Sequence, residues 1–291
     1  MLKRRIVSAI RAFRDPPFVD AGHFYSPLLG RAEREAQARR GEAAPVARSL
    51  PGIDLDPDRQ FALLESMLPG YADLPWSAGP DGHHRFHYEN RNYEYSDAIF
   101  YAAVLRRFRP SRVIEIGSGF SSALAMDVND LFLDGTVTFT FVEPYPDDRL
   151  LRLVGSDELG ARLVAKRLQD VDDAIFAELG ANDVLFIDST HVGRAGSDVN
   201  HLIFDVLPML APGVLVHVHD VFHPFEYPPD WLRSGRGWNE AYLVRAFLEF
   251  NDAFEVVLFN TYLEALRPEW FEENMPLCLK NPGGSIWLRR R

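Results

Sequence analysis

The sequence predicts an α/β protein with a doubly wound, mostly parallel sheet of seven strands and an N-terminal helical extension. Between about residues 96 and 260, short apolar runs alternate with segments of helical spacing. The run 184–187 is apolar throughout, as expected for a parallel strand covered on both faces. The last two runs, 254–259 and 285–288, have no helix-length pattern between them, which predicts an antiparallel hairpin at one end of the sheet.

Each element follows from its own local pattern. Apolar or β-branched runs that stop at a turn residue indicate strands, and apolar residues three or four positions apart indicate helices. The expected strands are residues 112–116, 136–142, 162–168, 184–187, 214–218, 254–259 and 285–288. The expected helices beside them are residues 96–108, 121–132, 147–154, 171–179, 199–210 and 238–250. Upstream, the expected elements are a solvated helix and linker at 31–49, a helix at 57–69 and an irregular segment at 71–95.

The first 92 residues are expected to form an extension beside a domain at residues 93–291. Residues 1–14 place apolar side chains at helical spacing among five Lys and Arg. This pattern suits a helix on an anionic membrane surface or a helix docked on protein, and its short apolar stripe favours docking. No apolar stretch suits a secretory signal or a membrane span of about 20 residues, so a cytoplasmic location is expected.

Composition excludes several classes of function. The 291 residues carry a formal net charge of −11, although residues 1–50 hold 10 Lys and Arg against 5 Asp and Glu. The remainder is therefore strongly acidic, which argues against a nucleic-acid partner and for a small-molecule one. The single cysteine, Cys278, excludes an internal disulfide and a Cys-based zinc site.

A glycine-rich turn follows the first predicted strand of the sheet. Gly117 and Gly119 allow a tight turn and a close approach of a ligand to the backbone. Ser121 and Ser122 open the next helix, where free N–H groups can bind polar ligand atoms. A dinucleotide fingerprint would place a third glycine at Ser122. The turn therefore favours another nucleoside-type ligand. The alternative is that the glycines serve only the geometry of the turn, which would give the same sequence pattern.

Two carboxylates accompany this turn. Glu115 is unusual inside a buried strand and needs partners there, one of which could be the amide end of a ligand. Glu143 ends the second strand, where an acidic side chain can accept hydrogen bonds from two ribose hydroxyls. A solvated turn residue is the alternative for Glu143.

These residues resemble the class I S-adenosylmethionine-dependent methyltransferases. The resemblance rests on Glu115-Ile-Gly117-Ser-Gly119-Phe-Ser121, on Glu143, and on Phe186-Ile187-Asp188. It covers roughly residues 93–291. Within the family, this stretch resembles the bacterial branch that includes small-molecule O-methyltransferases and their cephalosporin-hydroxylase-like relatives. The resemblance implies a Rossmann-like fold and S-adenosylmethionine as cofactor.

The resemblance also implies roles for single residues. Gly117 and Gly119 would line the methionine part of the cofactor, Glu143 would hold the ribose, and Gln169 or Asp170 would lie near the adenine. The complete set of expected cofactor-binding residues is Glu115, Gly117, Ser118, Gly119, Ser121, Ser122, Glu143, Asp170 and Asp188.

Histidines and carboxylates gather after two predicted strands. Asp188 and His191 follow residues 184–187, and His219, Asp220 and His223 follow 214–218. The carboxyl ends of adjacent parallel strands face one crevice, so these side chains can converge. Imidazoles with carboxylates suit a transition metal, or single histidines could simply hydrogen-bond within the crevice wall.

By the resemblance, Asp188, His219 and Asp220 would bind a divalent metal ion, with His219 at a position where an acid is expected. We expect His191 or His223 as the general base, because a free histidine titrates near neutral pH, and Asp188 as a residue that orients it.

The sequence thus predicts a methyltransferase acting on a small-molecule or glycan-like acceptor, with O-methylation expected and metal assistance possible in principle. Two alternatives stay open. One is a metal-dependent enzyme of the same fold that performs a hydroxylase-like reaction without methyl transfer. The other is a scaffold protein that binds a nucleoside without turnover.

Overall fold

The computed structural model describes residues 16–154 and 161–291. The helix expected in residues 1–14 lies outside the described residues. The chain forms two compact units, one of Met1–Pro45 with Tyr227–Trp238 and one of Val46–Glu226 with Asn239–Arg291. Residues 46–92 therefore belong to the larger unit together with the sheet, whereas the sequence suggested a division at residue 92.

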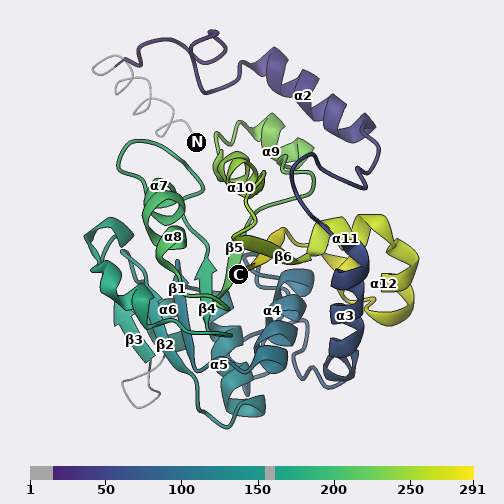
Figure 1. Cartoon of the computed structure of the whole chain (residues 1–291), viewed down its shortest axis with the longest axis vertical. Helices are drawn as coiled ribbons and strands as arrows, with labels where there is room; N and C mark the ends of the chain where they lie inside the picture. Colours follow the sequence, from purple (N-terminus) through teal and green to yellow (C-terminus); the bar gives the residue numbers. More distant parts are fainter. Residues whose placement is uncertain (1–15, 155–160) are drawn as a thin grey trace. The chain divides into compact units, whose positions relative to one another are not determined.

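The larger unit is built on a seven-stranded sheet in the order β3-β2-β1-β4-β5-β7-β6 (Figure 1). The strands are β1 (Arg112–Ile116), β2 (Thr138–Val142), β3 (Ala161–Val164), β4 (Val184–Ile187), β5 (Leu215–His219), β6 (Phe254–Phe259) and β7 (Ser285–Arg290). The first five pair in parallel, and β7 runs antiparallel to both β5 and β6. This order confirms the predicted doubly wound, mostly parallel sheet with an antiparallel end.

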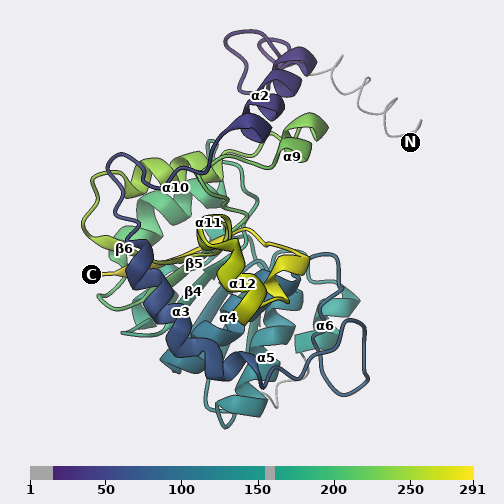
Figure 2. The same cartoon turned by 90° about the vertical axis from the view of Figure 1, so that its right-hand side faces the viewer.

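Helices cover both faces of this sheet, with α4 and α5 on one face and α7, α8 and α10 on the other (Figures 1 and 2). Around the parallel strands lie α3 (Pro57–Tyr71), α4 (Tyr95–Phe108), α5 (Phe120–Phe132), α6 (Asp148–Val154), α7 (Asp198–His201), α8 (Leu207–Met209) and α10 (Glu240–Leu248). The segments α7 and α8 flank a π-helical turn, Leu202–Val206, in which the Leu207 N–H reaches back to the Leu202 carbonyl. The sequence predicted one helix there. The wider turn lies just before Pro208, which cannot donate to a helical carbonyl.

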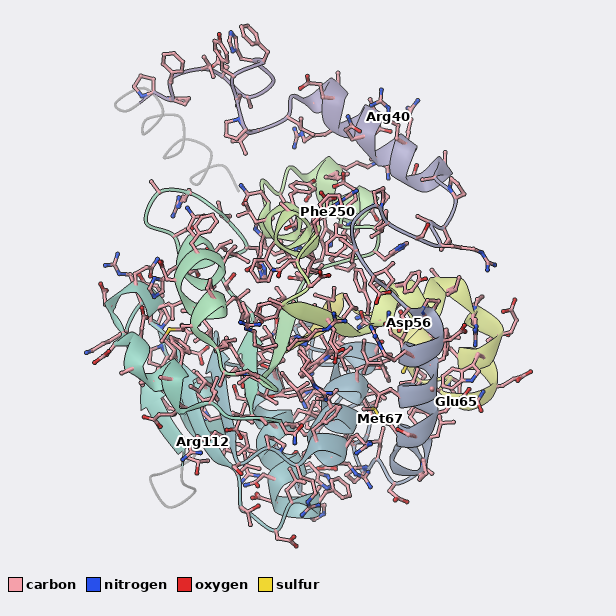
Figure 3. The ribbon with its side chains drawn as sticks, in the orientation of Figure 1. Arg40, Asp56, Glu65, Met67, Arg112 and Phe250 are labelled. Carbon is pink, nitrogen blue, oxygen red and sulfur yellow. The ribbon has the colours of Figure 1, made fainter. Side chains whose placement is uncertain are left out.

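The helix α3 shows how local sequence sets an element. The Asp56 side chain accepts a hydrogen bond from the Arg59 N–H at 3.0 Å, and Pro57 stands at the first helical position. Met67 is buried, whereas Glu65 is exposed and points away from it (Figure 3). One apolar face of this helix is therefore buried in the larger unit.

Three predictions about local structure are wrong: the helix at 171–179, the extent of the strand at 162–168 and the hairpin between the last two strands. The expected helix 171–179 is a short 3₁₀ segment, Asp173–Glu178, preceded by another at Leu168–Asp170, and β3 ends at Val164 opposite the end of β2. The Asp172 side chain accepts from the Ala174 N–H, a cap that competes with a longer helix. The connection between β6 and β7 is no hairpin turn, because α11 (Asn260–Leu266), α12 (Pro268–Asn274) and a 3₁₀ turn (Cys278–Lys280) lie in it.

The smaller unit contains α2 (Arg31–Ala43) and α9 (Pro229–Ser234). Arg233 of α9 forms ion pairs with Glu35 at 3.1 Å and Glu42 at 2.6 Å, both on α2. The guanidinium of Arg236 lies 3.9 Å from the ring centroid of Trp231. In the described part of the chain, no helix is both long enough and apolar enough to cross a bilayer.

Candidate functional site

A cavity of about 470 Å³ lies at the carboxyl ends of the parallel strands. Sheets of this kind bind ligands in the crevice outside these strand ends, where the strand order reverses, which here is between β1 and β4. The residues that line the cavity are Ile116, Gly117, Val142, Glu143, Pro144, Tyr145, Arg167, Leu168, Gln169, Asp188, Ser189, Thr190, Arg194, Gly196, Ser197 and Asp198. The predicted grouping of Gly117, Glu143 and Asp188 in one pocket is thus observed.

Gly117 fixes the approach of β1 to β4. Its φ is +79°, and a Cβ added to it would lie 2.0 Å from the backbone oxygen of Asp188. Its N–H donates to the Val142 carbonyl at 2.9 Å, while the Asp188 N–H donates to the Ile116 carbonyl at 2.8 Å. Only glycine combines this conformation with this contact, so the turn can bring the ends of three strands together.

Gly119 has a different surrounding. A Cβ on Gly119 would meet no atom within 4 Å, so the space beside this residue is open. Its N–H donates to the Ser122 hydroxyl at 3.1 Å, which satisfies one backbone group at the start of α5. The two glycines of the motif therefore have different roles. Gly117 is required by the geometry of the turn, whereas Gly119 borders an open space beside the turn.

Glu115 and Ser121 lie beneath the turn and do not line the cavity. The Ser121 hydroxyl donates to one carboxylate oxygen of Glu115, and the second oxygen has no partner among the described residues. Burial raises the pKa of Glu115 to about 8, since a charged carboxylate is poorly solvated there. Of the predicted cofactor residues, these two therefore support the turn from inside the protein.

We expect this raised pKa to make stability depend on pH. Between pH 4.5, near the ordinary pKa of Glu, and pH 8, the folded protein binds more protons at Glu115 than the unfolded chain. The free energy of unfolding should therefore fall as pH rises through this range. Glu115→Gln removes this contribution, so the variant should match the wild type near pH 5 and exceed it at pH 9 by on the order of a few kcal/mol. Urea unfolding across this pH range checks the difference, and parallel curves would contradict the assignment.

Glu143 lies at the end of β2 and lines the cavity. One of its oxygens accepts from the Tyr145 N–H at 2.9 Å, and the other lies 3.5 Å from the Ser118 backbone nitrogen. Of the two residues expected near the adenine, Gln169 lines the cavity and donates to the Gly196 carbonyl at 2.8 Å. Asp170 instead pairs with Arg167 at 2.8 Å and is absent from the lining.

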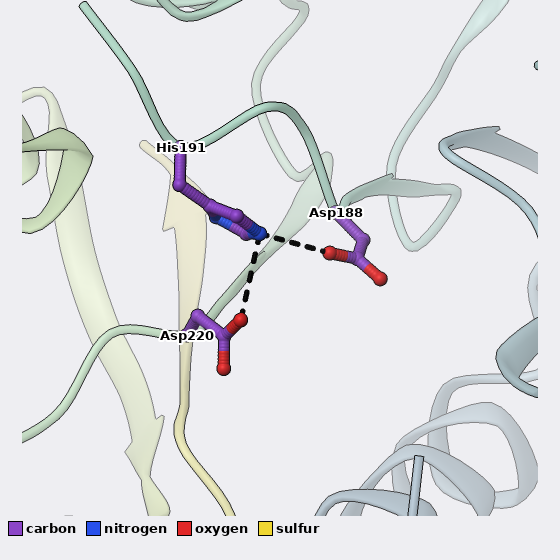
Figure 4. A group of neighbouring side chains, drawn as sticks. All are labelled: Asp188, His191 and Asp220. Carbon is purple, nitrogen blue, oxygen red and sulfur yellow. Dashed lines mark ion pairs between the residues drawn. The ribbon is translucent and has the colours of Figure 1, made fainter. Parts of the chain in front are cut away.

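Three of the clustered residues meet beside this cavity. Nε2 of His191 lies 3.3 Å from Oδ1 of Asp188 and 3.4 Å from Oδ2 of Asp220 (Figure 4). One ligand atom from each of the three lies within 4.8 Å of the others, which is a group able to hold a metal ion. The other ring nitrogen, Nδ1, lies 2.9 Å from Oε2 of Glu240.

Glu240 was not predicted from the sequence. It stands in the first turn of α10, where acidic residues usually face solvent and favour the helix dipole. Here it is buried, and the Ser189 hydroxyl donates to its Oε1 at 2.8 Å. No local pattern separates such a residue from an ordinary helix-start glutamate, so only tertiary structure reveals it.

The surroundings of His191 conflict with its predicted use as a base. Burial opposes its positive charge, but hydrogen bonds with Asp188 and Glu240 outweigh burial and raise its pKa to about 10. The imidazole is therefore protonated at neutral pH in the metal-free protein, and a protonated imidazole cannot accept a proton.

The other two predicted histidines are not members of this group of possible ligands, although His219 adjoins it through Asp220. The ring of His219 lies 5.3 Å from that of Tyr93 and 5.8 Å from that of His217, measured between centroids, and its Nε2 is 3.7 Å from Asp220. His223 packs at 4.8 Å against the ring of Tyr262, and burial lowers its pKa to about 4. Neither lines the cavity.

Comparisons of sequence place the chain among known proteins. Residues 114–221 match the family model described as a methyltransferase domain. A relative from Archaeoglobus fulgidus, described as an uncharacterized protein, is 35% identical over 164 residues, which make up 55% of this chain and 73% of that protein.

Solved structures of low identity resemble the chain over most of its length. The apo structure of CmcI-N160 has a TM-score of 0.44 and 15% identity over 96% of this chain and 98% of that chain. TomG from Streptomyces achromogenes, an O-methyltransferase involved in tomaymycin synthesis and solved with SAM, has a TM-score of 0.40 and 14% identity over 90% and 99%. A methyltransferase from Geobacter sulfurreducens has a TM-score of 0.41 and 13% identity over 90% and 100%. With TM-scores below 0.5, these likenesses carry no argument about the reaction of this chain.

Proposed function

We propose that this chain, which belongs to the class I S-adenosylmethionine-dependent methyltransferases, transfers the methyl group of S-adenosylmethionine to an oxygen atom of a small-molecule or glycan-like acceptor. The observation that supports this proposal most is the cavity at the reversal of strand order, where Gly117, Glu143 and Asp188 meet. In the reaction a bond forms between the acceptor oxygen and the methyl carbon as the bond from that carbon to sulfur breaks. The hydroxyl proton of the acceptor passes to solvent water, and S-adenosylhomocysteine leaves as the second product.

The binding roles follow from the cavity wall. Glu143 would accept hydrogen bonds from the ribose hydroxyls, because its carboxylate lines the cavity with few competing donors. The open space beside Gly119 would admit the part of the cofactor nearest the turn. Gln169, in the 3₁₀ segment that follows β3, would lie near the adenine base.

We further propose a divalent cation at the carboxyl ends of β4 and β5, held by Asp188 and Asp220. The described residues fit such an ion, since both carboxylates face a common histidine nitrogen. A bound cation lowers the pKa of a hydroxyl and orients it. Such an ion would favour loss of the acceptor's hydroxyl proton to solvent, so the reaction would not need His191, which is protonated, as a base.

Calorimetry with purified protein tests the cofactor assignment. S-adenosylmethionine and S-adenosylhomocysteine should bind, and NAD should not. Binding of NAD without either of the other two would overturn the proposal. Transfer of labelled methyl groups to a panel of hydroxylated small molecules and sugars then tests turnover, and binding without any transfer would favour the scaffold alternative.

Glu143→Ala is expected to weaken S-adenosylmethionine binding by about 10- to 100-fold, because two charge-assisted hydrogen bonds are lost. The calorimetric affinity of the folded variant measures this change. Glu269→Ala, which removes an exposed glutamate of α12, is the matched control and should bind like the wild type. Equal affinities for the wild type and Glu143→Ala would remove Glu143 from the site.

A further inference from the structure

His191 is surrounded by three carboxylates that contact its two ring nitrogens in different ways. On the Nδ1 side, Glu240 lies at 2.9 Å, a normal hydrogen-bond length. On the Nε2 side, the oxygens of Asp188 and Asp220 stand back at 3.3 and 3.4 Å. These two contacts are longer than the ~2.7–2.9 Å typical of a charge-assisted hydrogen bond.

The longer distances match the spacing of ligands around a metal ion. Donor atoms ~2.1 Å from a common ion are separated by ~3.0 Å in an octahedral site and by ~3.4 Å in a tetrahedral one. The observed separations of 3.3 and 3.4 Å fall in this range. Both distances from Nε2 therefore fit a shared ion, and the two carboxylate oxygens lie within 4.8 Å of each other.

On the side of His191 that faces away from the two aspartates, several hydrogen bonds fix the orientation of the imidazole ring. Glu240 is only 2% exposed and also accepts from the Ser189 hydroxyl at 2.8 Å. The N–H groups of Asn239 and Glu240 donate to the His191 carbonyl at 3.0 and 3.2 Å. A carboxylate that accepts from Nδ1–H leaves the Nε2 lone pair for a metal, an arrangement typical of metal-bound histidines.

The backbone of the same residues is strained. His191 has φ +61° and Asp220 has φ +56°, in the left-handed region that side-chain-bearing residues seldom adopt. Backbone strain of this kind is common at ligand clamps. The side chains of these two residues point toward each other (Figure 4).

We propose that Asp188, His191 and Asp220 bind a divalent transition-metal ion, with Glu240 as the residue that positions His191. This assignment rests on the proposed function and gives it a cation class. A nitrogen ligand favours Mn²⁺, Fe²⁺, Co²⁺ or Zn²⁺ over Mg²⁺ and Ca²⁺, which prefer oxygen alone. In this assignment His191 takes the place of His219, the histidine expected from the sequence, as the third ligand.

His219 fits the ligand role less well. Its ring lies beside Tyr93 and His217, and its Nδ1 is buried without a partner among the described residues. Its Nε2 approaches only the other oxygen of Asp220, Oδ1, at 3.7 Å. The matched pair His191→Gln and His219→Gln therefore separates the two assignments.

The test is Mn²⁺ binding by the full chain after treatment with chelator and without S-adenosylmethionine. Electron paramagnetic resonance of free Mn²⁺ gives the affinity, and electron spin-echo modulation of bound Mn²⁺ reports a nitrogen ligand. The wild type should bind one Mn²⁺ with nitrogen modulation and should prefer Mn²⁺ to Mg²⁺ at least about tenfold. His191→Gln should lose the modulation, His219→Gln should keep it, and Glu240→Gln should weaken binding about 10- to 100-fold.

Several outcomes would overturn the assignment. These are no Mn²⁺ binding by the wild type, loss of modulation in His219→Gln instead of His191→Gln, or equal affinity for Mg²⁺. Circular dichroism of each variant shows whether it is folded. If His191→Gln is not folded, Glu240→Gln and His219→Gln decide between the two histidines, because Glu240 contacts the ring of His191. Calorimetry with S-adenosylmethionine on the same wild-type sample distinguishes failure of the metal assignment from failure of the proposed function. Cofactor binding without Mn²⁺ binding would refute only the metal assignment.

Discussion

Gly117→Ala is expected to destabilise the protein by about 3 kcal/mol and to abolish measurable S-adenosylmethionine binding. Two costs combine at this position. An alanine at φ +79° adopts a conformation that a Cβ disfavours, and the Cβ itself would lie 2.0 Å from the Asp188 backbone oxygen. That oxygen belongs to the end of β4, so relief of the clash would separate β1 from β4 where the cavity lies.

The neighbouring glycine provides the matched control. Gly119 has an extended φ of −177°, and a Cβ there meets no atom within 4 Å. Gly119→Ala should therefore change the free energy of unfolding by less than about 1 kcal/mol, while the added methyl group narrows the space proposed for the cofactor. Urea unfolding and calorimetry of both variants measure the two effects. A Gly117→Ala protein as stable as Gly119→Ala would show that the turn relaxes more easily than its contacts indicate.

The parallel core of the fold was predictable because its strands are buried on both faces. Residues 184–187 lie in the middle of the sheet and are apolar without interruption, and the observed β4 has the same bounds. The connection from β6 to β7 was missed because α11 and α12 have only seven residues each and are divided at Pro268. Periodicity needs a window of about 11–18 residues, so helices this short leave little signal.

The cofactor side of the site was predictable for a topological reason. Gly117, Glu143 and Asp188 each follow a strand, and parallel strands bring their carboxyl ends to one edge. The same topological argument could not predict which histidine approaches the two aspartates. His219 lies on a strand, where its neighbours follow from register, but the direction of His191 depends on a loop and on Glu240, which is 49 positions away.

The roles of the two serines in the glycine turn also depend on contacts that the sequence does not show. Ser121 and Ser122 occur where ligand-binding residues are expected, but their hydroxyls bond Glu115 and the Gly119 N–H instead. A helix start needs partners for its own free N–H groups before it can serve a ligand. A polar residue at such a turn is therefore ambiguous until its partners are known.

Asp188→Asn is expected to reduce methyl transfer by at least about 100-fold, the largest loss of activity that we predict for a single change. Three carboxylates lie near the ring nitrogens of His191 in the described structure, and of these three only Asp188 also lines the cavity. The substitution keeps the side-chain shape but removes the negative charge. It should therefore weaken Mn²⁺ binding and S-adenosylmethionine binding together.

Two comparison variants separate these effects. Asp220 lies outside the cavity lining but approaches Nε2 of His191. Asp220→Asn should therefore lower the affinity for Mn²⁺ and leave the affinity for S-adenosylmethionine within about threefold of the wild type. Glu143→Ala should do the reverse, because Glu143 lines the cavity and is not one of the proposed ligands. The measurements are calorimetry, Mn²⁺ resonance and initial rates with an acceptor that the wild type methylates. If Asp188→Asn behaved like either single-effect variant, the cofactor and the cation would not meet at this carboxylate, because a residue shared by both sites must affect both ligands.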